Sequence, residues 1–170
     1  AFFQSGIGFG GSCFPKDVRA LIAKAEEVGV EPKILKDVIE VNEEQPLKLL
    51  ELLETHIPDV DRKTIGVLGL AFKPNTDDVR ESRAIPIVET LLRKGATVLA
   101  YDPMAMGNFR KLYPQVNYVS TAADALAADA VLITTEWEEF ESLNYTGKTV
   151  VDGRRIERAR DGSTYDGVCW

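Results

Sequence analysis

Hydrophobic positions along the chain change their spacing near residue 57, and this change divides the sequence into two parts. Before it, apolar residues recur at helical spacing and predict one helix over about Lys16–Val28, stopped by Gly29, and a second helix that begins near Pro32. Pro46 lies inside the second helix. Because a proline removes a backbone hydrogen bond, we expect it to kink or divide that helix.

The second helix carries more apolar surface than this short segment can cover. Its stripe comprises Ile34, Leu35, Val38, Ile39, Leu47, Leu49, Leu50, Leu52 and Leu53. A core helix of one domain is one explanation. A helix that packs against a second copy of the chain is the explanation we favour, because it accounts for the excess apolar surface.

From residue 59 onward, short apolar strands alternate with helices. We expect strands at Thr64–Leu68, Thr97–Tyr101, Ala130–Thr134 and Thr149–Val151, a helix at Ala84–Arg93, and an alanine-rich helix from about Thr121. Strands rich in Val, Leu and Ile with helices between them indicate a parallel sheet covered on both faces. The predicted fold class is α/β, with a helical dimerisation segment over 1–58 and a Rossmann-like parallel-sheet domain over 59–170.

Composition and charge narrow the function classes. The 170 residues are 45% hydrophobic and carry a net charge of −7, which supports one real core and argues against a nucleic-acid partner. No apolar run reaches the roughly 18 residues that span a bilayer, and no signal peptide opens the chain, so we expect no membrane partner and a cytoplasmic location. Cys13, Cys169 and His56 are the only cysteines and histidine, and we expect neither a disulfide framework nor a metal site.

A glycine-rich loop precedes Cys13. Four glycines in the six residues 6–11 free the backbone to approach a ligand, and Pro15 suits the first turn of the following helix. Cys13 is therefore expected at a helix N-terminus, where unpaired N–H groups and Lys16 favour the nucleophilic thiolate. Asp17 would orient a water molecule or a proton-carrying neighbour. These residues alone also fit a packed cysteine or a redox-sensing thiol.

Two cations follow strands of the predicted sheet. Lys73 comes after the first strand and Arg154 after the last. Ligands of open parallel sheets bind beyond the carboxyl ends of the strands, so both cations would face one crevice and neutralise a diphosphate. Asp102, at the end of the second strand, suggests a dinucleotide ribose site, but the turn after Gly66 lacks the Gly-x-Gly-x-x-Gly spacing of such sites.

Three segments resemble the nucleotide-sugar 6-dehydrogenases of the UDP-glucose/GDP-mannose dehydrogenase family. They are GIGFGGSCFPKD at 6–17, GLAFKPNTDDVRES at 69–82 and DGR at 152–154. The resemblance covers essentially the whole chain but only about the second half of a typical member. It implies that the chain is part of a longer polypeptide, whose NAD-binding domain, catalytic lysine and catalytic asparagine precede Ala1, and that the chain alone is inactive.

The resemblance also implies a reaction and residue roles. The C6 alcohol of a UDP-sugar would be oxidised to a carboxylate with two NAD, through a thiohemiacetal and a thioester on Cys13, with Asp17 positioning water. A homodimer would form through the central helix. Lys16 and Arg80 would contact the cofactor. The substrate would lie against Phe2, Gln4, Phe9, Gly10, Phe14, Phe72, Lys73 and Arg154, with Arg155 the less favoured partner.

Several alternatives stay open. The segment at 72–78 most resembles the UDP-glucose branch, but related enzymes oxidise GDP-mannose or UDP-N-acetylmannosamine with the same cysteine loop. The chain would otherwise be a non-catalytic sugar-nucleotide-binding dimerisation module, or a Rossmann-like regulator that binds a different nucleotide. Binding preference between NAD and UDP-sugars separates the last reading from the others.

Overall fold

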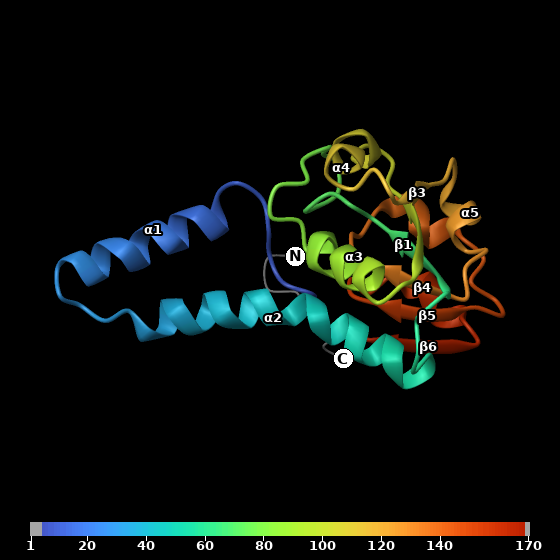
Figure 1. Ribbon diagram of the computed structural model, residues 1–170, viewed down its shortest axis with the longest axis horizontal. Coiled ribbons are helices and arrows are strands. Elements are labelled where there is room, and N and C mark those ends of the chain that lie inside the picture. Colours follow the sequence, from blue (N-terminus) through green and yellow to red (C-terminus); the bar gives the residue numbers. More distant parts are fainter. Residues whose placement is uncertain (1–4, 169–170) are drawn as a thin grey trace.

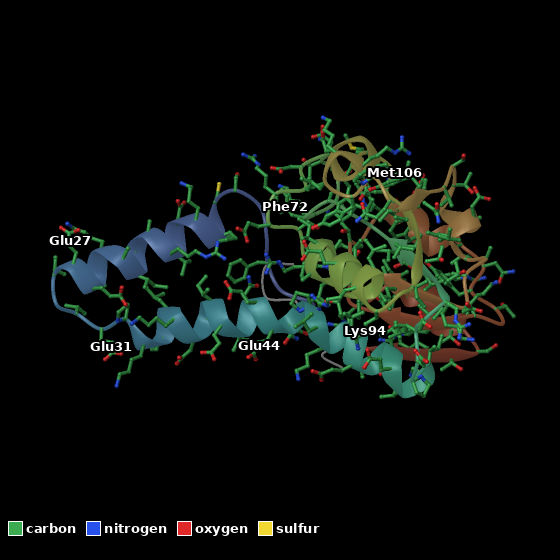
Figure 2. The ribbon with its side chains drawn as sticks, viewed as in Figure 1. Glu27, Glu31, Glu44, Phe72, Lys94 and Met106 are labelled. Atoms are coloured by element: carbon green, nitrogen blue, oxygen red, sulfur yellow. The ribbon has the colours of Figure 1, made fainter. Side chains whose placement is uncertain are left out.

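A helical arm and a parallel sheet make up the structure (Figure 1). The computed structural model describes residues 5–168. Helix α1 (Phe14–Glu27) and the first part of α2 (Lys33–His56) lie side by side and extend away from the sheet. The side chains between them on the arm reach few other parts of the molecule, as the ribbon with its sticks shows in Figure 2.

All six strands of the sheet are parallel, in the order β3-β2-β1-β4-β5-β6. The strands are β1 (Thr64–Leu68), β2 (Thr97–Tyr101), β3 (Asn117–Tyr118), β4 (Ala130–Ile133), β5 (Thr149–Asp152) and β6 (Thr164–Gly167). The helices between them are α3 (Ala84–Arg93), α4 (Met106–Leu112), α5 (Ala122–Ala125) and the short 3₁₀ helices η1 (Glu138–Ser142) and η2 (Glu157–Asp161). This order confirms the predicted α/β class and the Rossmann-like sheet.

Helices cover both faces of the sheet. The second half of α2 packs on β5, β6 and α3, while α5 contacts β1 and β2. Strands β1 and β4 are fully apolar inside, with Ile65, Val67 and Leu132 completely buried. Because the strand order reverses between β1 and β4, the carboxyl ends of these two strands open the crevice where such sheets bind ligands.

Helix α2 runs through Pro46 without division, contrary to the expected break. Pro46 has no N–H, so the carbonyl of Asn42 loses its partner within the helix. The guanidinium of Arg83 donates to that carbonyl instead, at 3.1 Å from Nη1. A replacement donor from the sheet domain thus accompanies the continuous helix.

Sequence patterns located most elements and missed the polar ones. The expected ranges of β1, β2 and α3 match the structure residue for residue, whereas α1 begins at Phe14, two residues early. The edge strands β3 and β6 and helix α4 were not expected. β6 reads Thr-Tyr-Asp-Gly, is only partly buried, and is fixed by its pairing with β5 rather than by its own hydrophobicity.

Candidate functional site

A cavity of about 440 Å³ opens beyond the carboxyl ends of β1, β4 and β5. It is lined by Ser5, Gly6, Gly8, Phe9, Gly10, Phe14, Phe72, Lys73, Glu136 and Arg154. The first six belong to the glycine-rich loop and the start of α1, and the others follow three different strands. The cavity therefore joins the cysteine loop to the crevice that the strand order creates.

The glycine-rich loop lies directly on the segment that follows β1. A Cβ at Gly10 would be 2.1 Å from the carbonyl oxygen of Glu81, and one at Gly11 would be 2.7 Å from the Phe72 ring. The N–H of Gly11 donates to the Arg80 carbonyl at 2.9 Å. These contacts explain why the loop needs glycine here: any side chain would push it off Phe72 and Glu81.

Asn42 of α2 holds the same loop from the other side. Its Oδ1 accepts from the N–H of Phe9 at 2.7 Å, and its Nδ2 donates to the Phe9 carbonyl at 3.0 Å. Asn42 is buried, with 6% of its surface exposed. The pair of bonds fixes the register of the loop on α2, so the position of the cysteine depends on this helix.

Cys13 occupies the N-cap position of α1, as expected from Pro15 and the glycine loop. Its side chain is exposed, and its carbonyl accepts the N–H of Asp17 at 2.8 Å. The Asp17 carboxylate forms an exposed ion pair of 2.6 Å with Lys16. Phe14 lines the cavity while Ser12 lines a second groove, so the thiol stands between the two spaces.

Asp102 shapes the loop that carries Phe72 and Lys73. Its Oδ2 accepts the N–H groups of Leu70 at 2.7 Å and Ala71 at 3.0 Å, and the Trp137 indole at 3.1 Å. The side chain is completely buried and engaged, which excludes the ribose role suggested by its place after β2. Lys73 is exposed at the cavity, and among residues 5–168 no carboxylate lies within ion-pair distance of it.

Asp152 does the same for the loop after β5. Its Oδ1 accepts from the N–H groups of Arg154 at 2.7 Å and Arg155 at 3.1 Å, and its Oδ2 from Ile156 at 2.7 Å and the Tyr165 hydroxyl at 3.2 Å. Burial raises the pKa of Asp152 to about 6, although these bonds oppose the shift. The carboxylate turns the chain so that Arg154 enters the cavity.

The guanidinium of Arg154 is mostly buried, unlike the surface cation that its position in the sequence suggested. Nε donates to the Thr134 carbonyl at 2.9 Å, Nη2 reaches the Gly8 carbonyl at 3.4 Å, and Glu136 Oε2 lies 3.4 Å from Nε. Burial lowers the pKa of Arg154, and the Glu136 and Asp152 carboxylates counter this effect. Arg154 thus ties the glycine loop to the end of β4.

A second groove, of about 1090 Å³, lies beside Cys13 and contains both residues expected to contact a cofactor. Hydrogen bonding to Asp17 raises the pKa of Lys16, and hydrogen bonding to Asp78 raises that of Arg80; the negative charge of Cys13 adds to both shifts. Exposed cations beside the thiol fit the phosphates of a dinucleotide. The turn after β1 does not, because Asp102 already takes its N–H groups.

The structure thus brings together six of the residues predicted to contact substrate: Phe9, Gly10, Phe14, Phe72, Lys73 and Arg154. Phe2 and Gln4 lie outside the described residues, as does Cys169. In the part of the chain that the structure describes, no group of acidic, histidine and cysteine side chains could hold a metal ion, and no helix is long and apolar enough to cross a membrane.

Sequence reasoning missed four residues of the site. They are Asn42, Arg83, Glu136 and Asp152. Asn42 offered a signal, since it is a polar residue four positions before a proline within an apolar stripe, and Asp152 lies in a quoted motif whose arginine alone received a role. Glu136 and Arg83 gave none, because only the folded chain shows what they face.

Comparison with known proteins agrees with this geometry. The sequence profile of the UDP-binding domain of the UDP-glucose/GDP-mannose dehydrogenase family matches residues 66–159, and that of the central domain matches residues 1–44. A UDP-glucose 6-dehydrogenase of Haloferax volcanii is 48% identical over 174 residues, which cover 99% of this chain and 40% of that protein.

Solved structures show the same likeness. A UDP-glucose dehydrogenase from Pyrobaculum islandicum superposes with a TM-score of 0.96 at 47% identity, over 99% of this chain and 40% of that one. A GDP-mannose dehydrogenase from Pseudomonas aeruginosa gives 0.87 at 31% identity, over 99% of this chain and 41% of that one. The chain spans about 40% of the length of these relatives. It belongs to the UDP-glucose/GDP-mannose dehydrogenase family.

Proposed function

We propose that this chain forms the nucleotide-sugar half of an NAD-dependent UDP-glucose 6-dehydrogenase, which converts UDP-glucose to UDP-glucuronate. The shared cavity supports this most directly, because Lys73 and Arg154 from the sheet face Phe9, Gly10 and Phe14 of the cysteine loop. A diphosphate requires cations, and the hexose that it carries must reach Cys13. The likeness to UDP-glucose 6-dehydrogenases favours UDP-glucose among the family's substrates.

Cys13 supplies the covalent chemistry in this proposal. NAD, when bound, accepts the hydride in both oxidations. After the first oxidation, the Cys13 sulfur bonds to the C6 aldehyde carbon and forms a thiohemiacetal. The second oxidation leaves a thioester, whose C–S bond water breaks, so that the carboxylate departs and the thiol returns. Lys16 and Asp17, one turn into α1, are placed to hold the water and take its proton.

Lys16 and Arg80 are the residues of this chain that would hold the cofactor. Both line the groove beside Cys13, and both are exposed cations whose pKa is raised by neighbouring carboxylates, Asp17 and Asp78 respectively. A cofactor phosphate arriving in this groove would compete with these carboxylates for the two side chains. Their place between the thiol and α4 supports contact with the cofactor rather than with the nucleotide sugar.

We also propose that α2 joins two copies of the chain. The arm exposes large apolar side chains, among them Leu21, Val28, Val30, Ile34, Val38, Val41 and Leu47. Ile34, Val38 and Val41 share one groove with Phe9 and Asn42. A second copy is the occupant we favour, because the exposed stripe runs along the arm that stands clear of its own sheet (Figure 1).

Calorimetric titration tests the substrate assignment. The chain is titrated with UDP-glucose, UDP, GDP-mannose and NAD, beside Lys73→Ala and the control Lys63→Ala, which removes an exposed lysine outside the cavity. We expect UDP and UDP-glucose to bind, and Lys73→Ala to weaken both about tenfold or more, as the loss of a charge-assisted bond requires. Preference for GDP-mannose would move the assignment to the other branch, and preference for NAD would favour a nucleotide-binding regulator.

A further inference from the structure

We propose that Glu136 is a substrate-recognition residue, whose carboxylate accepts hydrogen bonds from a vicinal diol of the nucleotide sugar. This inference rests on the proposed function, since it concerns the ligand of the same cavity. The diol would belong either to the ribose or to the hexose, which present the same hydroxyl chemistry. No role for Glu136 followed from the sequence motifs.

Glu136 is placed for contact with a ligand. It follows β4 at the point where the strand order reverses, and it lines the cavity with Phe72, Lys73 and Arg154. Its side chain is 44% exposed, and Oε2 lies 3.4 Å from Arg154 Nε. Within residues 5–168 this is the one interaction that involves the carboxylate, so Oε1 is open to hydroxyl donors.

Arg154 fixes the orientation of this carboxylate. The guanidinium is itself held by the Thr134 and Gly8 carbonyls, at 2.9 Å from Nε and 3.4 Å from Nη2. Side chains that are already held lose little freedom when a ligand binds. Glu136 therefore offers a preoriented acceptor at the wall of the cavity.

The distribution of charge separates the two ends of the cavity. At one end Lys73 has no carboxylate within ion-pair distance among the described residues, so its charge is available to a phosphate. At the other end Glu136 compensates part of the charge of Arg154. A carboxylate beside a phosphate is repelled, whereas beside a diol it accepts strong hydrogen bonds. We therefore place the diphosphate near Lys73 and a hydroxyl-bearing ring near Glu136.

A different role for Glu136 makes the opposite prediction. If the carboxylate only occupied Arg154 until a diphosphate displaced it, removal of its charge would favour the ligand. Replacement by glutamine would then tighten the binding of every diphosphate nucleotide. A diol acceptor requires weaker binding instead, because the neutral amide accepts less strongly and turns one acceptor into a donor.

Titration of Glu136→Gln with three ligands decides between these roles. The ligands are UDP-glucose, UDP and 2′-deoxy-UDP, and the matched control is Glu138→Gln, an exposed glutamate two residues away that does not line the cavity. We expect Glu136→Gln to weaken UDP-glucose about tenfold or more and Glu138→Gln to change nothing. If UDP keeps its affinity, the diol is that of the hexose. If UDP weakens equally and 2′-deoxy-UDP does not, the diol is that of the ribose.

Two results would overturn the inference, and they differ from failure of the proposed function. Unchanged or tighter binding of UDP-glucose by Glu136→Gln, with normal binding by the unaltered chain, removes the diol contact alone. Absence of any UDP binding by the unaltered chain removes the substrate assignment and this inference together. Thermal unfolding of both variants verifies that each is folded before the affinities are compared.

Discussion

The guanidinium of Arg83 donates a hydrogen bond of 3.1 Å to the backbone carbonyl of Asn42. The same side chain donates to the Glu81 carbonyl at 2.9 Å, so it joins the central helix to the segment on which the cysteine loop rests. Burial lowers the pKa of Arg83. The bond replaces the one that Pro46 cannot make, and it is therefore coupled to that proline.

Arg83→Met should lower the free energy of unfolding by about 2 to 3 kcal/mol, because it leaves buried carbonyls without donors. Chemical denaturation measures this change. In a Pro46→Ala background the residue at 46 regains an N–H for Asn42, so the same Arg83→Met substitution should cost less. Additive losses in this double-mutant cycle would contradict the proposed coupling.

Gly10→Ala should displace the cysteine loop. A Cβ at this position would lie 2.1 Å from the Glu81 carbonyl, a contact that only a backbone shift relieves. We expect a loss of about 1 to 3 kcal/mol in stability and weaker binding of UDP-glucose. Gly107→Ala is the control, because its Cβ meets nothing within 4 Å and alanine favours the helix. Equal stability of the two variants would refute the close fit.

Asp152 should titrate near pH 6, since burial raises its pKa from 3.8 to about 6. The raised pKa means that the folded state binds the proton more tightly than the unfolded state. This group's contribution is therefore fully present below about pH 4 and is lost as the pH rises through 6, on the order of 2 to 3 kcal/mol. Carbon NMR of the labelled carboxyl measures the pKa directly, and titration at or below pH 4 would show that the backbone donors outweigh burial.

Cys13→Ser, made in the native polypeptide that carries this chain, should abolish production of the acid while leaving UDP-glucose binding intact. The hydroxyl is a far weaker nucleophile than the thiolate, so the covalent intermediate should not form. Mass spectrometry of the protein during turnover detects the thioester. Ser12→Ala is the neighbouring control, and normal acid production by Cys13→Ser would refute the nucleophile assignment.

Val38→Glu should disrupt the proposed dimer by placing a charge on the exposed face of α2. Val38 is 40% exposed and lies in the groove with Ile34 and Val41. Light scattering should report a dimer for the unaltered chain and a monomer for the variant. Glu40→Gln on the same helix should leave the mass unchanged. A monomer before any substitution would exclude dimerisation through this helix by the chain itself.

Strands with apolar interiors could be predicted from sequence because hydrophobicity alone marks them. Thr64–Leu68 and Thr97–Tyr101 are such strands, and the cations after the first and last of them identified one crevice in advance. β6 could not be predicted, because its residues are polar and its pairing with β5 decides its conformation. Glu136 likewise has no local signal: its meaning comes from Arg154, which is distant in sequence and near only after folding.

Asp102 and Asp152 form their loops without using the side chains that those loops present. Each carboxylate accepts backbone N–H groups, from Leu70 and Ala71 in one loop and from Arg154 and Arg155 in the other. The conformation of the loop at Lys73 therefore does not depend on the lysine itself. Residue 73 is a position where the ligand preference can be redesigned by substitution while the backbone scaffold stays in place.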